Sequence, residues 1–371
     1  NASDGNSTDL FGSAVAMQES LAVVGAPIQG STRGKAYVFD AITGAELRAL
    51  TPAVRAIGDQ LGSSVAVHGG RVVVGAPQNS GRPGFALLQL QEAVPLPAAI
   101  VARRGDNAPT VVNAFFNNFT GYTMNSRGAA LLKATMTGAG TQDLGLWNNL
   151  SGVLDLVVQK GQSVEGPLVA NVLNQVMNSN QAAFAKLSLT GAGVTTANDV
   201  AILTDNGATI SVAAREANVL NGGGFTGQIM RDIKELVASS ADSQAAFFST
   251  FVTADTTQDS GIVIIDSNAN VIGGLREGDV APFAGTVIGP ITERVTFSGK
   301  SVIASVALTG AAPVSNAALL QVTPGQPTTA IARKGDAAPG IVGAIFTNFV
   351  AETASTIDEP VFLADTNAAA A

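Results

Sequence analysis

Short apolar runs, each bounded by polar or glycine-containing turns, dominate the chain from its beginning. Residues 13–17 and 21–24 are two such runs, on either side of the polar turn 18–20. Two further runs follow at residues 36–40 and 46–50. Short runs between turn-forming residues indicate β-strands, because a helix needs a longer amphipathic stretch. The pattern therefore predicts four short antiparallel strands at the start of the chain.

The same arrangement is then repeated. Residues 11–27 read FGSAVAMQESLAVVGAP and residues 61–77 read LGSSVAVHGGRVVVGAP, an offset of 50 residues from 11 to 61. The third strand of this second unit is expected at residues 84–88. A repeat of this length marks a fold built from supersecondary units, each of which buries its apolar face on the next. Four short strands per unit are typical of a β-propeller blade.

After residue 100 the repeated motif changes, while a similar spacing persists. The segment 102–109, ARRGDNAP, returns at residues 275–282 as LREGDVAP and at residues 332–339 as ARKGDAAP, and weaker copies surround Gly161 and Ala217. Two sets of apolar runs recur at the same spacing as this motif. The first set begins near residues 128, 181, 244, 300 and 359, and the second lies at 145–147, 201–203, 261–264 and 318–320. These markers predict five further units, with the first set as their inner strands.

Seven units in all predict an all-β fold, a seven-bladed β-propeller of four-stranded antiparallel blades. One propeller would span residues 1–371, with blades 1–2 in residues 1–100 and blades 3–7 in residues 101–371. The last unit ends soon after its first apolar run. Because an open ring leaves an unpaired strand edge, either the N-terminal stretch completes this blade or the sequence is incomplete.

The longer connections are expected to lie before the inner strands. Residues 107–125 and 217–243 are the clearest examples. Within the second, the apolar residues of segment 227–237 recur at helical spacing, which predicts one short surface helix. Almost no other helix is expected.

The first two units resemble FG-GAP repeats, which occur in integrin-type β-propellers and in many bacterial surface proteins. Phe11-Gly12 and Gly25-Ala26-Pro27 carry the motif, and Gly75-Ala76-Pro77 repeats its second half. Leu61-Gly62 departs from it at the first letter, and Thr43-Gly44 fits the bacterial version. The resemblance covers roughly residues 1–90. The remaining units look like a degenerate propeller-type repeat of secreted bacterial proteins.

The composition limits the classes of binding partner and the cellular compartment that we expect. The net charge is −8 and basic residues form no cluster with aromatics, which argues against nucleic acid. The absence of cysteine excludes disulfides and thiolate metal sites. No apolar run has the ~18–20 residues of a membrane helix. Few lysines, many small polar residues and a first residue other than Met predict an exported bacterial protein, periplasmic or extracellular, whose signal peptide has been removed.

The tripeptide Arg104-Gly105-Asp106 is the sequence that integrins recognise, yet its context favours a turn. Glu277-Gly278-Asp279 and Lys334-Gly335-Asp336 occupy the same place in later units. A tripeptide that recurs with the blades is explained by a glycine at positive φ and an aspartate that binds nearby backbone. The predicted structural turn and packing residues are Gly25, Gly75, Gly105, Asp106, Gly278, Asp279, Gly335 and Asp336.

Calcium is the one cofactor left open. Integrin-type repeats often hold it with alternating Asp and Asn oxygens, which suit a hard cation. The nearest approach here is segment 3–9, with Asp4 and Asp9 as weak candidates, and Asp59 precedes the second repeat. A turn satisfied by its own hydrogen bonds is the competing interpretation.

Candidates for catalysis are few. His68 is the only histidine, and no Gly-x-Ser-x-Gly motif accompanies it. Asp242 with Asp255, or Glu277 with Asp279, are carboxylate pairs of the type that cleaves glycans. The aromatic residues that usually bind sugars are scarce, since Trp147, Tyr37 and Tyr122 are the whole supply of Trp and Tyr.

The sequence therefore favours a non-enzymatic interaction or structural module outside the cytoplasm. Its partner would be another protein, such as an integral membrane complex that the module scaffolds. The alternative is a cell-surface propeller that binds or cleaves a polysaccharide. Carboxylates clustered in a central funnel would favour the alternative, and an exposed apolar patch would favour the scaffold.

Overall fold

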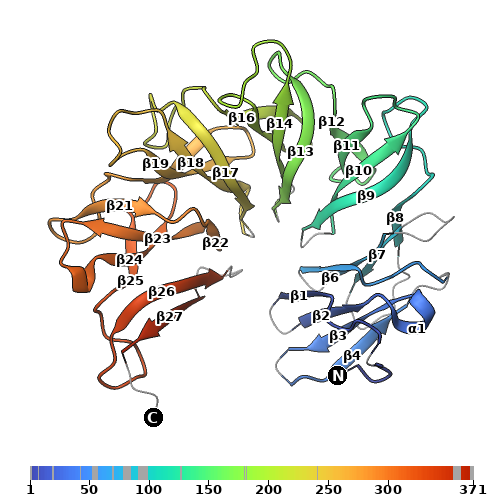
Figure 1. Cartoon of the computed structure of the whole chain (residues 1–371), viewed down its shortest axis with the longest axis horizontal. Helices are drawn as coiled ribbons and strands as arrows, with labels where there is room; N and C mark the ends of the chain where they lie inside the picture. The colour runs from blue at the N-terminus through green and yellow to red at the C-terminus, as the bar shows by residue number, and fades with distance from the viewer. Residues whose placement is uncertain are drawn as a thin grey trace. The chain divides into compact units, whose positions relative to one another are not determined.

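The computed structural model is built almost entirely from antiparallel strands (Figure 1). It describes residues 2–6, 8–18, 21–41, 43–51, 57–68, 71–77, 85–90, 99–125, 128–178, 180, 182–239, 241–353 and 361–367. Within these residues the helices are α1 (Gln29–Thr32) and the 3₁₀ turn η1 (Pro313–Ser315). The strands of the described residues form seven sheets. The chain divides into two compact units, residues 1–162 and 163–371, and each is described by itself.

The first unit holds three four-stranded sheets, in each of which every strand pairs with the next one along the chain. The first sheet contains β1 (Ala14–Gln18), β2 (Leu21–Ala26), β3 (Lys35–Asp40) and β4 (Glu46–Leu50). The second contains β5 (Ser64–His68), β6 (Arg71–Ala76), β7 (Phe85–Leu90) and β8 (Ala99–Arg103). The third contains β9 (Phe115–Met124), β10 (Ala130–Thr137), β11 (Leu144–Asn148) and β12 (Asp155–Gln159). The strands predicted in the two FG-GAP-like units are confirmed.

The second unit continues the same up-and-down order. The fourth sheet contains β13 (Leu168–Met177), β14 (Ala183–Thr190), β15 (Val200–Asp205) and β16 (Ile210–Arg215). The fifth contains β17 (Met230–Ala238), β18 (Gln244–Phe251), β19 (Ser260–Asp266) and β20 (Val271–Arg276). The sixth contains β21 (Val287–Ile291), β22 (Thr296–Ser298), β23 (Ser301–Thr309), β24 (Ala317–Val322) and β25 (Thr329–Arg333). The last contains β26 (Phe346–Thr353) and β27 (Val361–Thr366).

The sheets pack face to face, and β19 shows how. Its residues are buried from Ser260 to Ile265, so the strand reads as one continuous apolar run. Ile262 and Ile264 belong to the core shared with the sixth sheet, while Val263 and Ile265 belong to the core shared with the fourth. Alternate side chains therefore face opposite neighbours, as a blade inside a propeller requires.

The predicted inner strands of the later units are wrong by one strand. The runs that begin near 128, 181, 244 and 300 are β10, β14, β18 and β23, each of which lies second in the pairing order of its sheet. The run that begins near 359 starts outside the described residues and continues as β27, which pairs with β26. The first strands lie in segments expected to be connections, as β9 does within 107–125. These strands are half exposed and carry register shifts, one of them between the partners of Lys133 and Ala134. A bulge breaks the alternation by which a strand is recognised from sequence.

The helix predicted at residues 227–237 is also wrong, because β17 occupies this segment. Met230, Ile233 and Leu236 are all buried. Their spacing of three is not helical, since two register shifts in the pairing with β18 separate them. Each bulge adds a residue, so a strand with two bulges can imitate a helical period.

Candidate functional site

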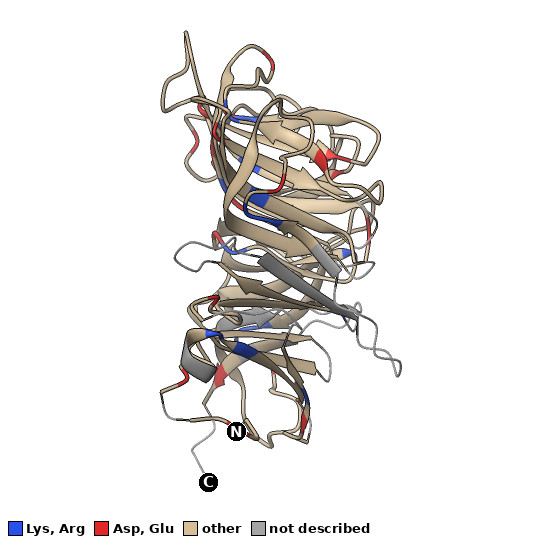
Figure 2. Ribbon diagram, turned by 90° about the vertical axis from the view of Figure 1, so that its right-hand side faces the viewer, with Lys and Arg blue, Asp and Glu red and all other residues tan. Residues whose placement is uncertain are grey.

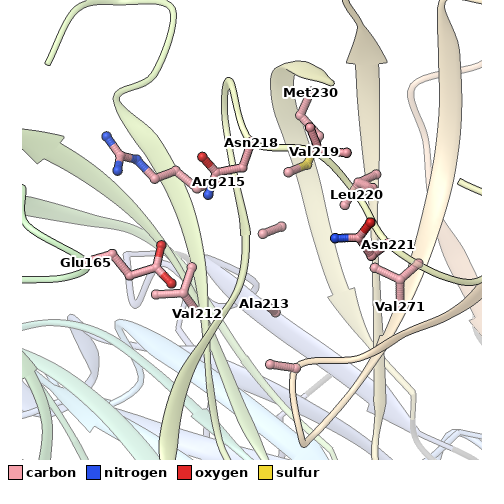
Figure 3. A pocket seen from close by; sticks show the side chains of 12 residues that line it. Glu165, Val212, Ala213, Arg215, Asn218, Val219, Leu220, Asn221, Met230 and Val271 are labelled. Atoms are coloured by element: carbon pink, nitrogen blue, oxygen red, sulfur yellow. The ribbon is translucent and has the colours of Figure 1, made fainter. Parts of the chain in front are cut away.

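A pocket of about 200 Å³ lies in the second unit, beside the sheet of β13–β16 (Figure 3). Its wall is the end of β16, residues 212–215, together with the loop residues 218–221. Met230 closes it from β17, and Val271 comes from the first residue of β20. Most of these residues have apolar side chains, but the surface that they leave open in the pocket is mainly polar.

Polar side chains stand at the rim of this pocket. Glu165, Asn218 and Asn221 are exposed, and within the described residues their side chains make no hydrogen bond or ion pair. Arg215 is half-buried, and its Nε and Nη2 atoms lie 3.4 Å from the carbonyl oxygen of Asn198. One carboxylate and two amides are therefore available to a ligand.

The backbone around the pocket is strained. Glu165 and Ala269 line it with φ of 51° and 67°, and Ala217, beside Asn218, has φ of 65°. These are three of the eight non-glycine residues with positive φ in the described part of the chain. Such conformations cost energy, and they gather at binding and catalytic sites.

A glycine run and a buried phenylalanine hold the pocket loop. Gly222 bridges to Val271, and a side chain on Gly223 would come within 2.6 Å of the Gly273 nitrogen. Phe225 is 2% exposed, with its ring centroid 5.7 Å from that of Phe251. Gly274 leaves room for it, because a Cβ there would lie 2.5 Å from the Phe225 ring.

Exposed apolar residues extend from the pocket. Val219 lines it and forms a backbone bridge with Ile229, whose carbonyl accepts a 2.8 Å hydrogen bond from Val252. These three side chains are 49%, 37% and 54% exposed. Contiguous exposed apolar surface marks sites of association. We call Val219, Ile229 and Val252 the apolar patch.

The Arg-Gly-Asp segment is a hydrogen-bonded turn. Gly105, Gly278 and Gly335 have φ of 87°, 89° and 91°. In the same three turns Asp106, Asp279 and Asp336 accept a hydrogen bond from the backbone N–H of the arginine three residues earlier, at 2.9–3.0 Å. Gly25 and Gly75 do not have positive φ, but a Cβ would lie 1.9 Å from the Gly62 carbonyl oxygen and 2.3 Å from Ser64 Oγ.

The two calcium candidates lie in the loop before β1. Tyr37 donates a 2.7 Å hydrogen bond to Asp4, and the Lys35 ammonium forms an ion pair with the same carboxylate. These contacts, Lys35 first, lower the pKa of Asp4. Asp9 is buried and accepts a 2.6 Å hydrogen bond from the backbone of Asn6. No group of three or more Asp, Glu or His positioned to hold a metal occurs among the described residues.

The carboxylate pairs are not arranged for acid–base catalysis. Asp242 and Asp255 lie beyond opposite ends of β18, an eight-residue strand of about 26 Å. Glu277 is buried against Ser260 Oγ at 2.9 Å, and burial raises its pKa. Asp279 is committed to its turn with Arg276. His68 is the last residue of β5, and its side chain is outside the described residues.

A buried polar network lies between the fourth and fifth sheets. Glu216 accepts 3.1 Å hydrogen bonds from the backbone N–H groups of Val200 and Ile233. Burial raises its pKa to about 7 against the opposing effect of these bonds. The Lys186 ammonium donates a 2.7 Å bond to the Lys234 carbonyl, and burial lowers its pKa.

Charged residues of both signs are interspersed along the ribbon (Figure 2). Charged residues are only 13% of the chain and the net charge is −8. This is unlike the basic stripe of a nucleic-acid-binding protein. Neither helix in the described residues is long and apolar enough to cross a membrane.

Comparison with known families now classifies the chain. A model described as "Family of unknown function (DUF7453)" matches residues 92–370, which is 279 of the 371 residues. The chain belongs to the DUF7453 family. An FG-GAP repeat model matches residues 1–39, which confirms the resemblance carried by Phe11-Gly12 and Gly25-Ala26-Pro27. The pocket and the apolar patch lie within the DUF7453 part. No curated protein matches the sequence.

Several solved structures are similar at low identity. The β-propeller domain of the Trilobed protease from Pyrococcus furiosus is 8% identical, with a TM-score of 0.42, covering 87% of this chain and 98% of that one. Sqt1 from Chaetomium thermophilum, bound to the N-terminus of ribosomal protein L10, is 12% identical. Its TM-score is 0.35, and the match covers 97% of this chain and 95% of that one. A PL25 ulvan lyase is 9% identical, with a TM-score of 0.34, and the match covers 91% of this chain and 85% of that one.

The DUF7453 pocket was not found from the sequence. The one sequence feature that could have indicated the pocket is the segment Gly222-Gly223-Gly224-Phe225, in which three glycines precede an aromatic residue far from any predicted strand. Nothing in the sequence around Glu165 or Val271 indicates that these residues line a pocket, because only the fold brings them together from distant parts of the chain.

Proposed function

We propose that this chain is a non-enzymatic interaction module outside the cytoplasm, which holds a protein partner within a larger assembly. The observation that carries the proposal is the exposed apolar patch beside a pocket whose rim holds polar side chains without a partner among the described residues. A buried anchor surrounded by contacts that exclude water is how protein interfaces gain most of their affinity. The FG-GAP repeats and the lack of cysteine support the location.

We also propose that the seven sheets are the blades of one propeller. The up-and-down strand order and the shared cores of neighbouring sheets within each unit support this arrangement. A density map of the isolated chain that shows the sheets around one axis tests it. An open arc in that map would contradict a closed ring.

The interaction is tested by a photo-reactive phenylalanine analogue at Val219 in the native host. Position 314 is the matched control, since Val314 is 70% exposed in η1 and outside the patch. We expect a discrete protein adduct from position 219 alone, and its loss when Ile229→Asp is added. The same purified partner should bind the unmodified chain and not the Ile229→Asp variant.

Two results would overturn this proposal. The first is equal adducts at both positions or none at 219. The second is turnover of a surface polysaccharide by the purified chain, abolished by carboxylate substitutions, which would establish the enzymatic alternative.

A further inference from the structure

The dipeptide Asn-Gly occurs twice in the sequence, at Asn206-Gly207 and at Asn221-Gly222. Both copies lie in the second unit, the first between β15 and β16 and the second in the pocket loop. An asparagine before glycine is prone to lose its side-chain amide, because glycine has no Cβ and its backbone nitrogen can approach the asparagine side chain. In a folded chain the reaction depends on how firmly the amide and that nitrogen are held.

Hydrogen bonds hold both reacting groups in the first copy. Oδ1 of Asn206 accepts bonds from the backbone N–H groups two and three residues later, at 3.0 and 2.8 Å. Its Nδ2 donates a 3.0 Å bond to Oδ1 of Asn268. The N–H of Gly207 donates a 2.8 Å bond to the Asp205 carboxylate, whose negative charge opposes removal of the proton from that nitrogen. The Asn206 amide therefore reaches the nitrogen only after several bonds break.

The second copy is held much less firmly. Asn221 is exposed, and within the described part of the chain its side-chain amide makes no hydrogen bond. Figure 3 shows this amide pointing into the pocket. Gly222 has φ of 101° and is followed by two more glycines, and its N–H donates a 3.1 Å bond to the neutral hydroxyl of the exposed Thr226. The Asn221 amide can thus turn toward the nitrogen, and the pocket has room for the water that the reaction consumes.

We propose that Asn221 is a site of spontaneous deamidation, which converts a neutral side chain of the pocket into a carboxylate. The Gly222 nitrogen attacks Cγ of Asn221 and forms a succinimide ring. The Cγ–Nδ2 bond breaks, and Nδ2 leaves as ammonia with the proton that the Gly222 nitrogen loses. Water then opens the ring at either carbonyl, which gives aspartate or isoaspartate. One water is consumed and one ammonia is released, with no oxidation or reduction.

The product changes the pocket in two ways. The new carboxylate joins that of Glu165, and Arg215 is the one cationic side chain among the lining residues, so the rim becomes more negative. The formal net charge of the chain goes from −8 to −9. Isoaspartate also inserts a CH₂ group into the backbone just before Gly222, whose bridge to Val271 helps to hold the pocket loop. This inference is independent of the proposed interaction function.

The test follows the intact, folded chain during incubation at mildly alkaline pH, where the backbone nitrogen loses its proton more readily. Trypsin separates the two sites into peptides 187–215 and 216–231. Deamidation raises the mass of a peptide by one unit, and fragmentation locates the changed residue. We expect Asn221 to react at least about tenfold faster than Asn206, because the hydrogen bonds of Asn206 must break first.

Two controls isolate the effect of the fold. The chain unfolded in guanidinium chloride keeps both dipeptides and loses these contacts, so the two rates should become similar. Asn221→Gln keeps an amide at this position but needs a larger ring to react. The mass gain at position 221 should therefore disappear in this variant, while the rate at Asn206 stays the same. Circular dichroism verifies that the variant is folded.

Three outcomes would overturn the inference. The first is an equal or faster reaction at Asn206 in the folded chain. The second is no change at Asn221 over a period in which the unfolded chain reacts. The third is a mass gain in peptide 216–231 that persists in Asn221→Gln, which would place the reaction at another residue.

Discussion

The hydroxyl of Tyr37 donates a 2.7 Å hydrogen bond to Oδ1 of Asp4, and thereby fastens the loop before β1 to the third strand of the first sheet. Tyr37 is fully buried, and Lys35 forms an ion pair with the other oxygen of the same carboxylate. Ser3 adds hydrogen bonds to Glu46 on β4. The start of the chain is thus bound to its own sheet.

Calcium should not stabilise this loop, because the Lys35 ammonium already neutralises Asp4. We expect the same melting temperature with excess calcium and with a chelator. A calcium-dependent rise that is lost in Asp9→Asn would instead show that the loop binds the ion.

Replacing Tyr37 with Phe should lower the free energy of unfolding by about 1 kcal/mol. Bonds to charged groups are worth about 1.5–3 kcal/mol, and the 47% exposure of the Asp4 side chain reduces that value. Because the pKa of Asp4 is lowered in the folded state, this stability is present above its ordinary value of 3.8 and is lost as the pH falls below it. Urea titrations of both proteins at neutral pH and near pH 3 measure the difference, which should shrink in acid.

Ala217→Gly should stabilise the protein by roughly 0.5 kcal/mol. Ala217 occupies the position that glycine holds in the related turns, with φ of 65°. Relief of a left-handed residue, about 1–2 kcal/mol, exceeds the entropic cost of glycine, about 0.5–1 kcal/mol. Gly105→Ala is the reverse change in open space and should destabilise by a similar amount. Urea midpoints test both, and shifts of the same sign would contradict this account.

Phe225→Ala should cost about 3–5 kcal/mol, since it empties a fully buried site between Phe251 and Gly274. The pocket loop should also loosen, with faster hydrogen exchange at residues 217–224. Phe115→Ala is the control, because Phe115 is 42% exposed and should cost much less. Equal losses in the two variants would show that Phe225 is not an anchor.

Glu216 should make the protein more stable in mild acid. Its folded-state pKa of about 7 lies above the ordinary value of 4.5, so the folded state binds the proton more tightly. The contribution is complete below about pH 4.5 and is lost as the pH rises through about 7, a change of roughly 1–3 kcal/mol. Glu216→Gln should flatten the dependence of unfolding free energy on pH between 5 and 8. Urea titrations of both proteins across this pH range measure the slope, and an unchanged slope in Glu216→Gln would contradict this account.

The sequence by itself determined the repeated strands and their turns. The runs at 13–17, 36–40 and 261–264 are strands as predicted. Gly105 and Asp106 form their turn through a backbone conformation and a hydrogen bond only three residues apart. Such features follow from the sequence because local sterics and local alternation decide them.

Tertiary structure alone decided where bulges fall and which distant residues meet. The two bulges of β17 gave this strand a helix-like spacing of apolar residues in the sequence. Their positions are fixed by the pairing with β18, and the sequence of β17 alone does not reveal them. Asp4 forms an ion pair with Lys35, because the first sheet folds the loop back on β3. Glu165, Ala213 and Val271 form one pocket for the same reason: packing between sheets brings together residues that no local pattern connects.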